Sequence, residues 1–175
     1  MRLLTTALLF ALACSPAQAV EISHFKSGLA CTNSTLVEGQ TGWICHVTED
    51  IRVTDQGRCQ YDGKDYLCTW VGFEFDYRGA KPGDKLDCST EQSQPTSAGN
   101  PNQELETSST KQEFSLPLKD SQGHFFNPQY FTFVTRAPKE SLLIDTGRCS
   151  FKGKTVFEYT YRLQYPERPE HGSGV

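Results

Sequence analysis

The decapeptide Asp55–Lys64, DQGRCQYDGK, returns 90 positions later as Asp145–Lys154, DTGRCSFKGK. Each copy runs directly into a segment, 65–77 or 155–165, in which apolar and polar residues alternate. Alternation with a period of two indicates a β-strand and does not fit a helical stripe. The pattern therefore predicts two β-hairpins related by an internal duplication. Because the offset is even, the same strand face is apolar in both.

The Asp-Gly and Lys-Gly turns decide the register of these hairpins. A two-residue loop would pair Cys59 with Tyr66 and put Arg58 on the apolar face. A three-residue loop with a glycine bulge shifts the pairing by one residue and moves Arg58 off that face. We predict the bulged loop. It directs Cys59 and Cys149 into the core as a candidate disulfide and turns Cys68 away, so that Cys59 and Cys68 cannot bridge each other.

The first nineteen residues resemble a secretory signal peptide. A basic start precedes an apolar run from Leu3 to Ala13, and Ala17-Gln18-Ala19 fits a small-x-small cleavage site. The apolar run is too short to cross a bilayer of about 30 Å. We expect cleavage after Ala19 and export to the periplasm or the medium. In an alternative reading Cys14 carries a lipid anchor, although Ala11 stands where such signals usually have leucine.

An even number of cysteines behind a signal peptide predicts disulfides in an oxidising compartment. The six after the predicted cleavage site are Cys31, Cys45, Cys59, Cys68, Cys88 and Cys149. Only Cys149 follows the polar stretch 89–112, so if all six are paired it must bond to a cysteine of the first half. No Cys-x-x-Cys spacing occurs, and Cys45-His46 is a lone neighbour pair. We therefore predict no metal site and no cofactor.

The predicted fold is all-β, a disulfide-stabilised antiparallel sandwich of about ten short strands with little helix. Its first repeat covers residues 20–88 and its second covers 113–165. Between them, residues 89–112 contain one leucine and no aromatic residue, which favours a linker or loop. The polar residues 166–175 form a tail.

The charge pattern bears on partners. There are 21 acidic and 17 basic residues, and the basic ones form no run. Nucleic acid is excluded as an expected partner, because phosphate binding needs a clustered Lys/Arg face. No second apolar run reaches membrane length, so no transmembrane segment is predicted. The expected partner is a protein of the envelope or the extracellular space.

No catalytic motif is present: we find no nucleophile elbow, phosphate-binding glycine loop, His-Glu-x-x-His or dinucleotide fingerprint. The repeated element could present two equivalent polar sites, and large aromatic residues beside Cys68 could form a contact patch unless another strand covers them. The candidate binding residues are Asp55, Arg58, Asp145, Arg148, Tyr66 and Trp70. In a structural reading of the element, Asp caps a turn, Gly supplies a positive φ, and Arg pairs with the Asp or lies along the strand.

Three functions compete. The expected one is a secreted or periplasmic, non-catalytic binding protein, with inhibition of a secreted enzyme as one form. The first alternative is a structural component of an envelope or surface assembly. The second is an enzyme with a site in the cleft between the halves. A pocket with His46 or His124 within hydrogen-bond reach of a carboxylate would favour the enzyme.

Overall fold

The computed structural model describes residues 19–31, 42–54, 57–61, 64–95, 98–99, 110–132 and 141–166. The regular elements in these ranges are all strands, which confirms the all-β prediction. No membrane-spanning helix is found in these ranges. The strands are β1 (Glu21–Cys31), β2 (Trp43–Val47), β3 (Asp50–Arg52), β4 (Gly57–Tyr61), β5 (Lys64–Arg78), β6 (Lys85–Gln92), β7 (Ala98–Gly99), β8 (Lys111–Pro117), β9 (Gln122–Thr132), β10 (Leu142–Phe151) and β11 (Lys154–Gln164).

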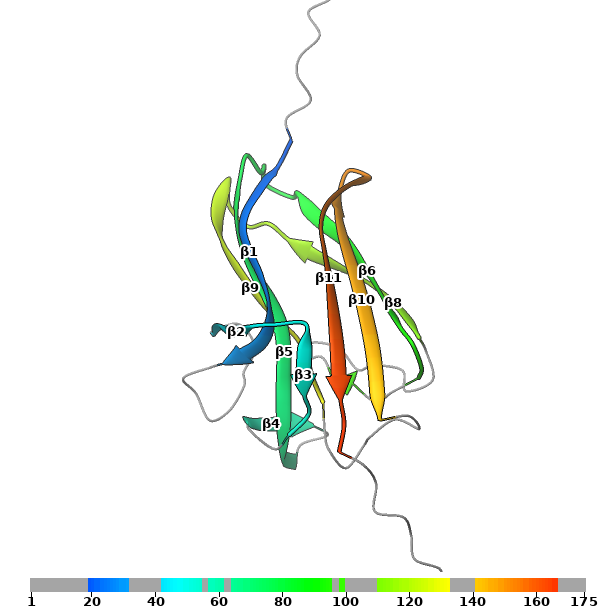
Figure 1. Cartoon of the computed structure of the whole chain (residues 1–175). Coiled ribbons are helices and arrows are strands. Elements are labelled where there is room, and N and C mark those ends of the chain that lie inside the picture. The colour runs from blue at the N-terminus through cyan, green and yellow to red at the C-terminus, as the bar shows by residue number, and fades with distance from the viewer. Residues whose placement is uncertain are drawn as a thin grey trace, which may run out of the picture.

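The strands form two layers that face each other (Figure 1). One sheet has six strands in the order β2-β1-β5-β9-β7, with β4 also paired to β5. The other has five strands in the order β3-β11-β10-β6-β8. Neighbouring strands are antiparallel except β3 and β11, which are parallel. The predicted sandwich of antiparallel sheets is confirmed.

Aromatic residues that alternate along β5 and β11 fill the space between the sheets. The ring of Phe73 lies 5.3 Å from that of Phe157 and 5.2 Å from that of Tyr159. Phe25 of β1 stacks on Phe157 at 4.6 Å. The buried members of the alternating faces are Val71, Phe73, Phe75, Tyr77, Phe157, Tyr159, Tyr161, Leu163 and Tyr165. The faces predicted from the period of two are therefore the core faces, apart from the exposed Leu67 at the start.

The first hairpin has the register that we did not favour. Tyr61 pairs with Lys64 and Cys59 with Tyr66, as in a two-residue loop, so the bulged-loop prediction is wrong for this copy. In this register Cys59 and Cys68 lie on the same face of the hairpin, so the prediction that they cannot bridge each other loses its basis. Cys68 is disulfide-bonded and fully buried.

The second hairpin combines a tight turn with a bulge. Lys152 and Gly153 have φ values of 49° and 81°, both positive as in a type I′ turn. A register shift between Cys149 and Ser150 then places Cys149 opposite Phe157. The bulged register is confirmed here, although the extra residue lies in the strand and not in the loop. The two hairpins share a sequence but not a register, and the duplication stays a prediction.

Cys149 bonds to Cys88, a cysteine of the first half, and Cys31 bonds to Cys45. The candidate pair of Cys59 with Cys149 is therefore wrong. Cys88 lies directly opposite Cys149 on the neighbouring strand, so the bond joins β6 to β10 within one sheet. Disulfides of this kind indicate an oxidising compartment.

Strands reach into both ends of the predicted linker. β6 continues to Gln92, β8 begins at Lys111, and the short β7 pairs with β9 between them. These strands pair with partners far away in sequence, which local composition does not reveal. Residues 96–97 and 100–109 lie outside the described part of the chain, as do 1–18 of the predicted signal peptide and 167–175 of the predicted tail.

Tyr161 makes a polar contact between the two sheets. Its hydroxyl donates a hydrogen bond to the Gly72 carbonyl oxygen at 2.7 Å, and burial raises its pKa well above the usual value. Tyr161→Phe is expected to lower the free energy of unfolding by about 1–2 kcal/mol in urea denaturation, because a buried carbonyl loses its donor. Tyr77→Phe is the matched control: among the described residues its hydroxyl accepts a hydrogen bond only from the Asp120 amide, at 3.5 Å, so this substitution should cost less. Equal losses would contradict the role given to the Gly72 bond.

Candidate functional site

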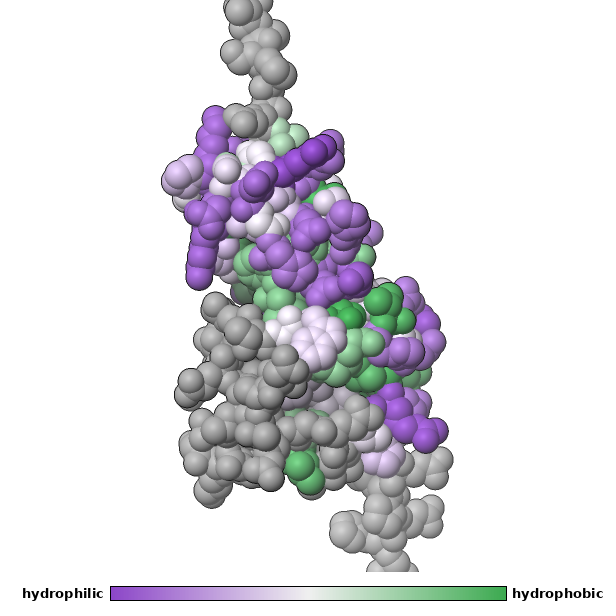
Figure 2. All heavy atoms as spheres, turned by 90° about the vertical axis from the view of Figure 1, so that its left-hand side faces the viewer, coloured by the Kyte–Doolittle hydropathy of each residue, from purple (hydrophilic) through white to green (hydrophobic). Residues whose placement is uncertain are grey.

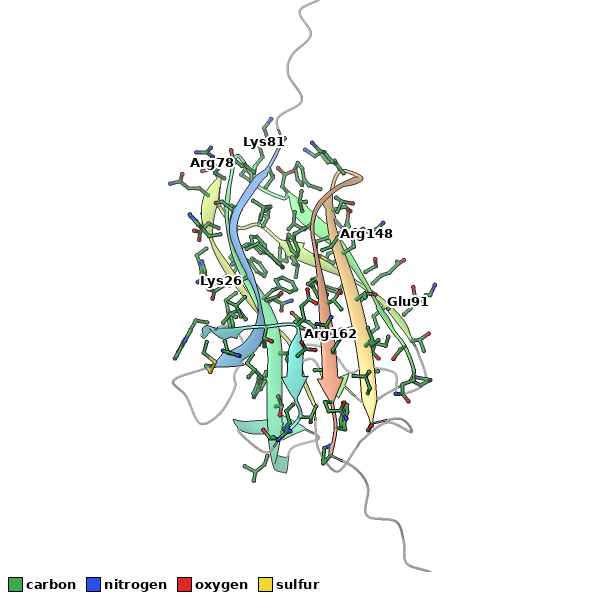
Figure 3. The ribbon with its side chains drawn as sticks, viewed as in Figure 1. Lys26, Arg78, Lys81, Glu91, Arg148 and Arg162 are labelled. Carbon is green, nitrogen blue, oxygen red and sulfur yellow. A yellow bond between two sulfur atoms is a disulfide. The ribbon has the colours of Figure 1, made fainter. Side chains whose placement is uncertain are left out.

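The outer face of the five-stranded sheet is mostly polar and carries two adjoining hollows of about 460 and 530 Å³. Both are lined by Ser89, Glu113 and Arg148, so they form one continuous depression across the sheet. In Figure 3, Arg148 and Glu91 lie on the side of this sheet that faces away from the other sheet.

Strand register explains the hollows. Glu113, Ser89, Arg148 and Glu158 stand in one row across β8, β6, β10 and β11. Ser89 is the short side chain between two long ones, which leaves space above it. The Arg148 Nε donates to Glu158 Oε1 at 2.8 Å, while its Nη nitrogens bond no residue in the described part of the chain. Arg148 can therefore offer a planar pair of donors to an acceptor in the depression.

Charges of both signs surround the depression. Lys85 Nζ donates to Ser115 Oγ at 3.2 Å and lies 3.1 Å from Asp87 Oδ1. The hydrogen bonds from Lys85 and Ser115 to the Asp87 carboxylate hold the pKa of Asp87 below its usual range. The charged lining residues are Lys85, Lys111, Arg148, Asp87, Glu91, Glu113 and Glu158. A lining with both positive and negative side chains is complementary to a polar surface that also carries charges of both signs.

A histidine and carboxylate cluster occupies the outer face of the other sheet. His24 Nδ1 and His124 Nδ1 each lie 2.8 Å from a different oxygen of Asp76. The hydrogen bonds from His124 and His24 hold the pKa of Asp76 below its usual range. His24 has a φ of +50° within an irregular stretch of β1, which turns its side chain toward Asp76. Figure 2 faces this sheet and shows hydrophilic side chains over its upper half.

Glu74 lies beside this cluster and is only 4% exposed. Its Oε1 accepts a hydrogen bond from Lys26 Nζ at 2.8 Å, and its Oε2 accepts one from the Ile44 amide at 2.9 Å. Burial acts to raise the pKa of Glu74, but the bonds from Lys26 and Ile44 outweigh burial, and the pKa is lowered. His124 Nε2 is 3.9 Å from the same carboxylate. No three metal-binding side chains in the described ranges are arranged to hold an ion.

The structure separates the candidate binding residues. Trp70 is only 7% exposed, which favours the alternative that a further strand covers it over an exposed contact patch. For Tyr66 and Arg58 only the backbone is described, in β5 and β4, and Asp55 lies outside the described residues.

Asp145 and Arg148 do not form one polar site. Asp145 is fully buried and accepts a hydrogen bond from the Thr90 hydroxyl, whereas Arg148 is exposed on the opposite face and pairs with Glu158. Their positions differ by three, and an odd separation along a strand puts two side chains on opposite faces. In this copy Asp145 therefore does not pair with Arg148, whereas the side chains of Asp55 and Arg58 lie outside the described part of the chain.

Sequence reasoning named His124 as a possible neighbour of a carboxylate but missed Asp76 and His24 beside it, because these residues are scattered along the chain. Asp76 of β5 lies between Ser23 of β1 and His124 of β9 in the sheet, and this register brings the groups together. The alternation of Glu74 and Asp76 on one strand face was the available signal, but it does not reveal the neighbours of that face.

Comparison with known proteins adds no assignment. No protein family model matches the sequence, and no curated protein matches it.

Proposed function

We propose that this protein is a non-catalytic binding protein of an oxidising extracytoplasmic compartment, and that it binds a protein partner on the outer face of its five-stranded sheet. The observation that carries this proposal is the depression centred on Arg148, where two hollows share Ser89, Glu113 and Arg148. Arg148 points Nη donors into the depression that bond no other described residue, and arginine is enriched among the residues that dominate protein interfaces.

The lining side chains project from regular strands, not from loops. Cys88–Cys149 joins the two strands that supply Ser89 and Arg148, one position away from each residue. Side chains that the fold holds in place lose less conformational entropy when a partner binds. A preorganised surface of this kind suits stable recognition, including inhibition of a secreted enzyme.

The histidine cluster supports catalysis less well than this face supports binding. Each oxygen of Asp76 is hydrogen-bonded to one imidazole. In Glu74, one oxygen accepts a hydrogen bond from Lys26 and the other accepts one from the Ile44 amide. The two hollows described above lie on the opposite sheet. The cluster therefore ties β1, β5 and β9 together, and the carboxylates have their hydrogen-bonding needs met within the protein.

The test begins with capture of a partner by the oxidised chain from envelope and secreted fractions. The affinity of the purified partner is then measured for two variants. Arg148→Glu should weaken binding by about ten-fold or more, because it breaks the Glu158 pair and reverses the charge at the centre of the depression. Arg78→Glu should change affinity by less than about two-fold.

Arg78 is a matched control because it also forms an exposed cross-strand pair, with Glu21, on the other sheet. The two arginine side chains have similar exposure, 70% for Arg78 and 64% for Arg148. Figure 3 shows them on opposite sides of the molecule. Equal effects of the two substitutions, or no effect of Arg148→Glu, would reject this face as the binding surface.

A further inference from the structure

The two described disulfides differ in their access to solvent. Cys45 is exposed and Cys31 is half-buried, whereas Cys88 and Cys149 are 5% and 0% exposed. Thiol–disulfide exchange begins when a thiolate attacks one sulfur in line, so its rate depends on access to that sulfur. A small thiol reductant can reach Cys45 without any opening of the core.

The Cys31–Cys45 bond fastens an edge strand. β2 is the last strand of its sheet and pairs with β1 alone among the described strands. The two strands cross closely at Gly28, where a Cβ would lie 2.1 Å from the carbonyl oxygen of His46. This crossing and the disulfide together hold β2 against β1.

β2 in turn covers a charged group. The Ile44 amide donates to Glu74 Oε2, and Ile44 itself is 5% exposed. The other Glu74 oxygen is held by Lys26, which is half exposed. If β2 leaves, Glu74 loses its backbone donor and gains access to water. The exposed carboxylate would then stand beside Asp76 and His124.

We propose that Cys31–Cys45 is a thiol-exchange site that fastens β2 over Glu74, and that a dithiol reductant opens it while Cys88–Cys149 stays oxidised. This assignment does not rest on the proposed binding function.

The exchange is balanced. One thiolate of the dithiol attacks Cys45 Sγ, the Cys31–Cys45 bond breaks, and Cys31 leaves as a thiolate. The second thiolate then attacks the reductant's sulfur in the mixed disulfide and releases Cys45. Two electrons pass to the protein, the dithiol becomes a disulfide, and its two protons end on Cys31 and Cys45.

The first measurement treats the folded, oxidised chain with dithiothreitol and follows each thiol by alkylation and peptide mass mapping. Cys31 and Cys45 should become alkylated at least about ten-fold faster than Cys88 and Cys149. In the partly reduced protein, hydrogen exchange of the Ile44 amide should accelerate by at least about ten-fold, while the paired amides of β10 and β11 keep their protection.

A variant without the Cys31–Cys45 bond tests whether loss of this bond alone, with no reductant present, exposes the Ile44 amide. The double substitution Cys31→Ser/Cys45→Ser should show the fast Ile44 exchange without dithiothreitol. Reduction of Cys88–Cys149 at the same rate as Cys31–Cys45 would overturn the selectivity. Unchanged Ile44 protection after Cys31 and Cys45 are reduced would overturn the fastening role. If the variant does not fold, the dithiothreitol series alone decides both points.

Discussion

Replacing both Cys88 and Cys149 with alanine is expected to lower the free energy of unfolding by about 4 kcal/mol. The bond closes a loop with a sequence separation of 61 residues, and the chain-entropy model gives about this value for such a loop. Both sulfurs are buried in the core cluster, so their removal also leaves unfilled volume there. Urea denaturation under non-reducing conditions measures the loss as a lower midpoint.

The other described disulfide is the control for this prediction. Cys31–Cys45 closes a separation of only 14 residues, for which the same model gives about 3 kcal/mol. Cys45 is also exposed, so its removal opens no cavity in the core. Cys31→Ala/Cys45→Ala should therefore cost less than Cys88→Ala/Cys149→Ala. A larger cost for the Cys31–Cys45 pair would show that loop length and burial do not decide the stability here.

Gly147→Ala is expected to cost about 3 kcal/mol of unfolding free energy, near the upper end for overpacking a core. A Cβ at Gly147 would lie 1.9 Å from Cζ and 2.2 Å from Oη of Tyr159, which stands directly opposite on β11. The Tyr159 ring cannot move aside easily, because it packs against Phe73 and Tyr161 at 5.2 Å each. An aromatic side chain that covers a cross-strand glycine is a recognised way to stabilise a glycine in a sheet.

Gly153→Ala is the matched control for that substitution. Gly153 lies in the turn of the same hairpin with a φ of 81°, and no atom would lie within 4 Å of its Cβ. Alanine should therefore cost only the strain of a positive φ, about 1 kcal/mol. Thermal or urea unfolding of the two variants gives the comparison. A smaller loss for Gly147→Ala than for Gly153→Ala would contradict the packing of Tyr159 described above.

Gly147 also shows where local reasoning about the repeated element fails. The sequence reading explained this glycine by a positive φ, as for a turn residue. In the structure it lies inside β10, and the reason for glycine is the ring of Tyr159 on the next strand. The turn glycine of the same hairpin, Gly153, does have a positive φ. Turn chemistry is local and readable from sequence, whereas close approach depends on which strand is the neighbour.

The sequence by itself determined the class of the fold. Alternation along 65–77 and 155–165 requires strands with one buried face, because a period of two puts successive side chains on opposite sides. The lone position of Cys149 beyond residues 89–112 required that, if every cysteine is paired, it bond to a cysteine of the first half. Both conclusions follow from spacing along the chain, and neither depends on which strands are neighbours.

Only the tertiary structure decided register, disulfide partners and the candidate site. A shift of one residue turns every side chain of a strand over, and the two hairpins differ by such a shift despite their shared sequence. The order of the strands places Cys88 opposite Cys149, His24 and His124 next to Asp76, and Ser89 beside Arg148. These contacts join residues more than 45 positions apart. Which of them form depends on the sum of the cross-strand pair interactions over the whole sheet, and no local stretch of sequence contains that sum.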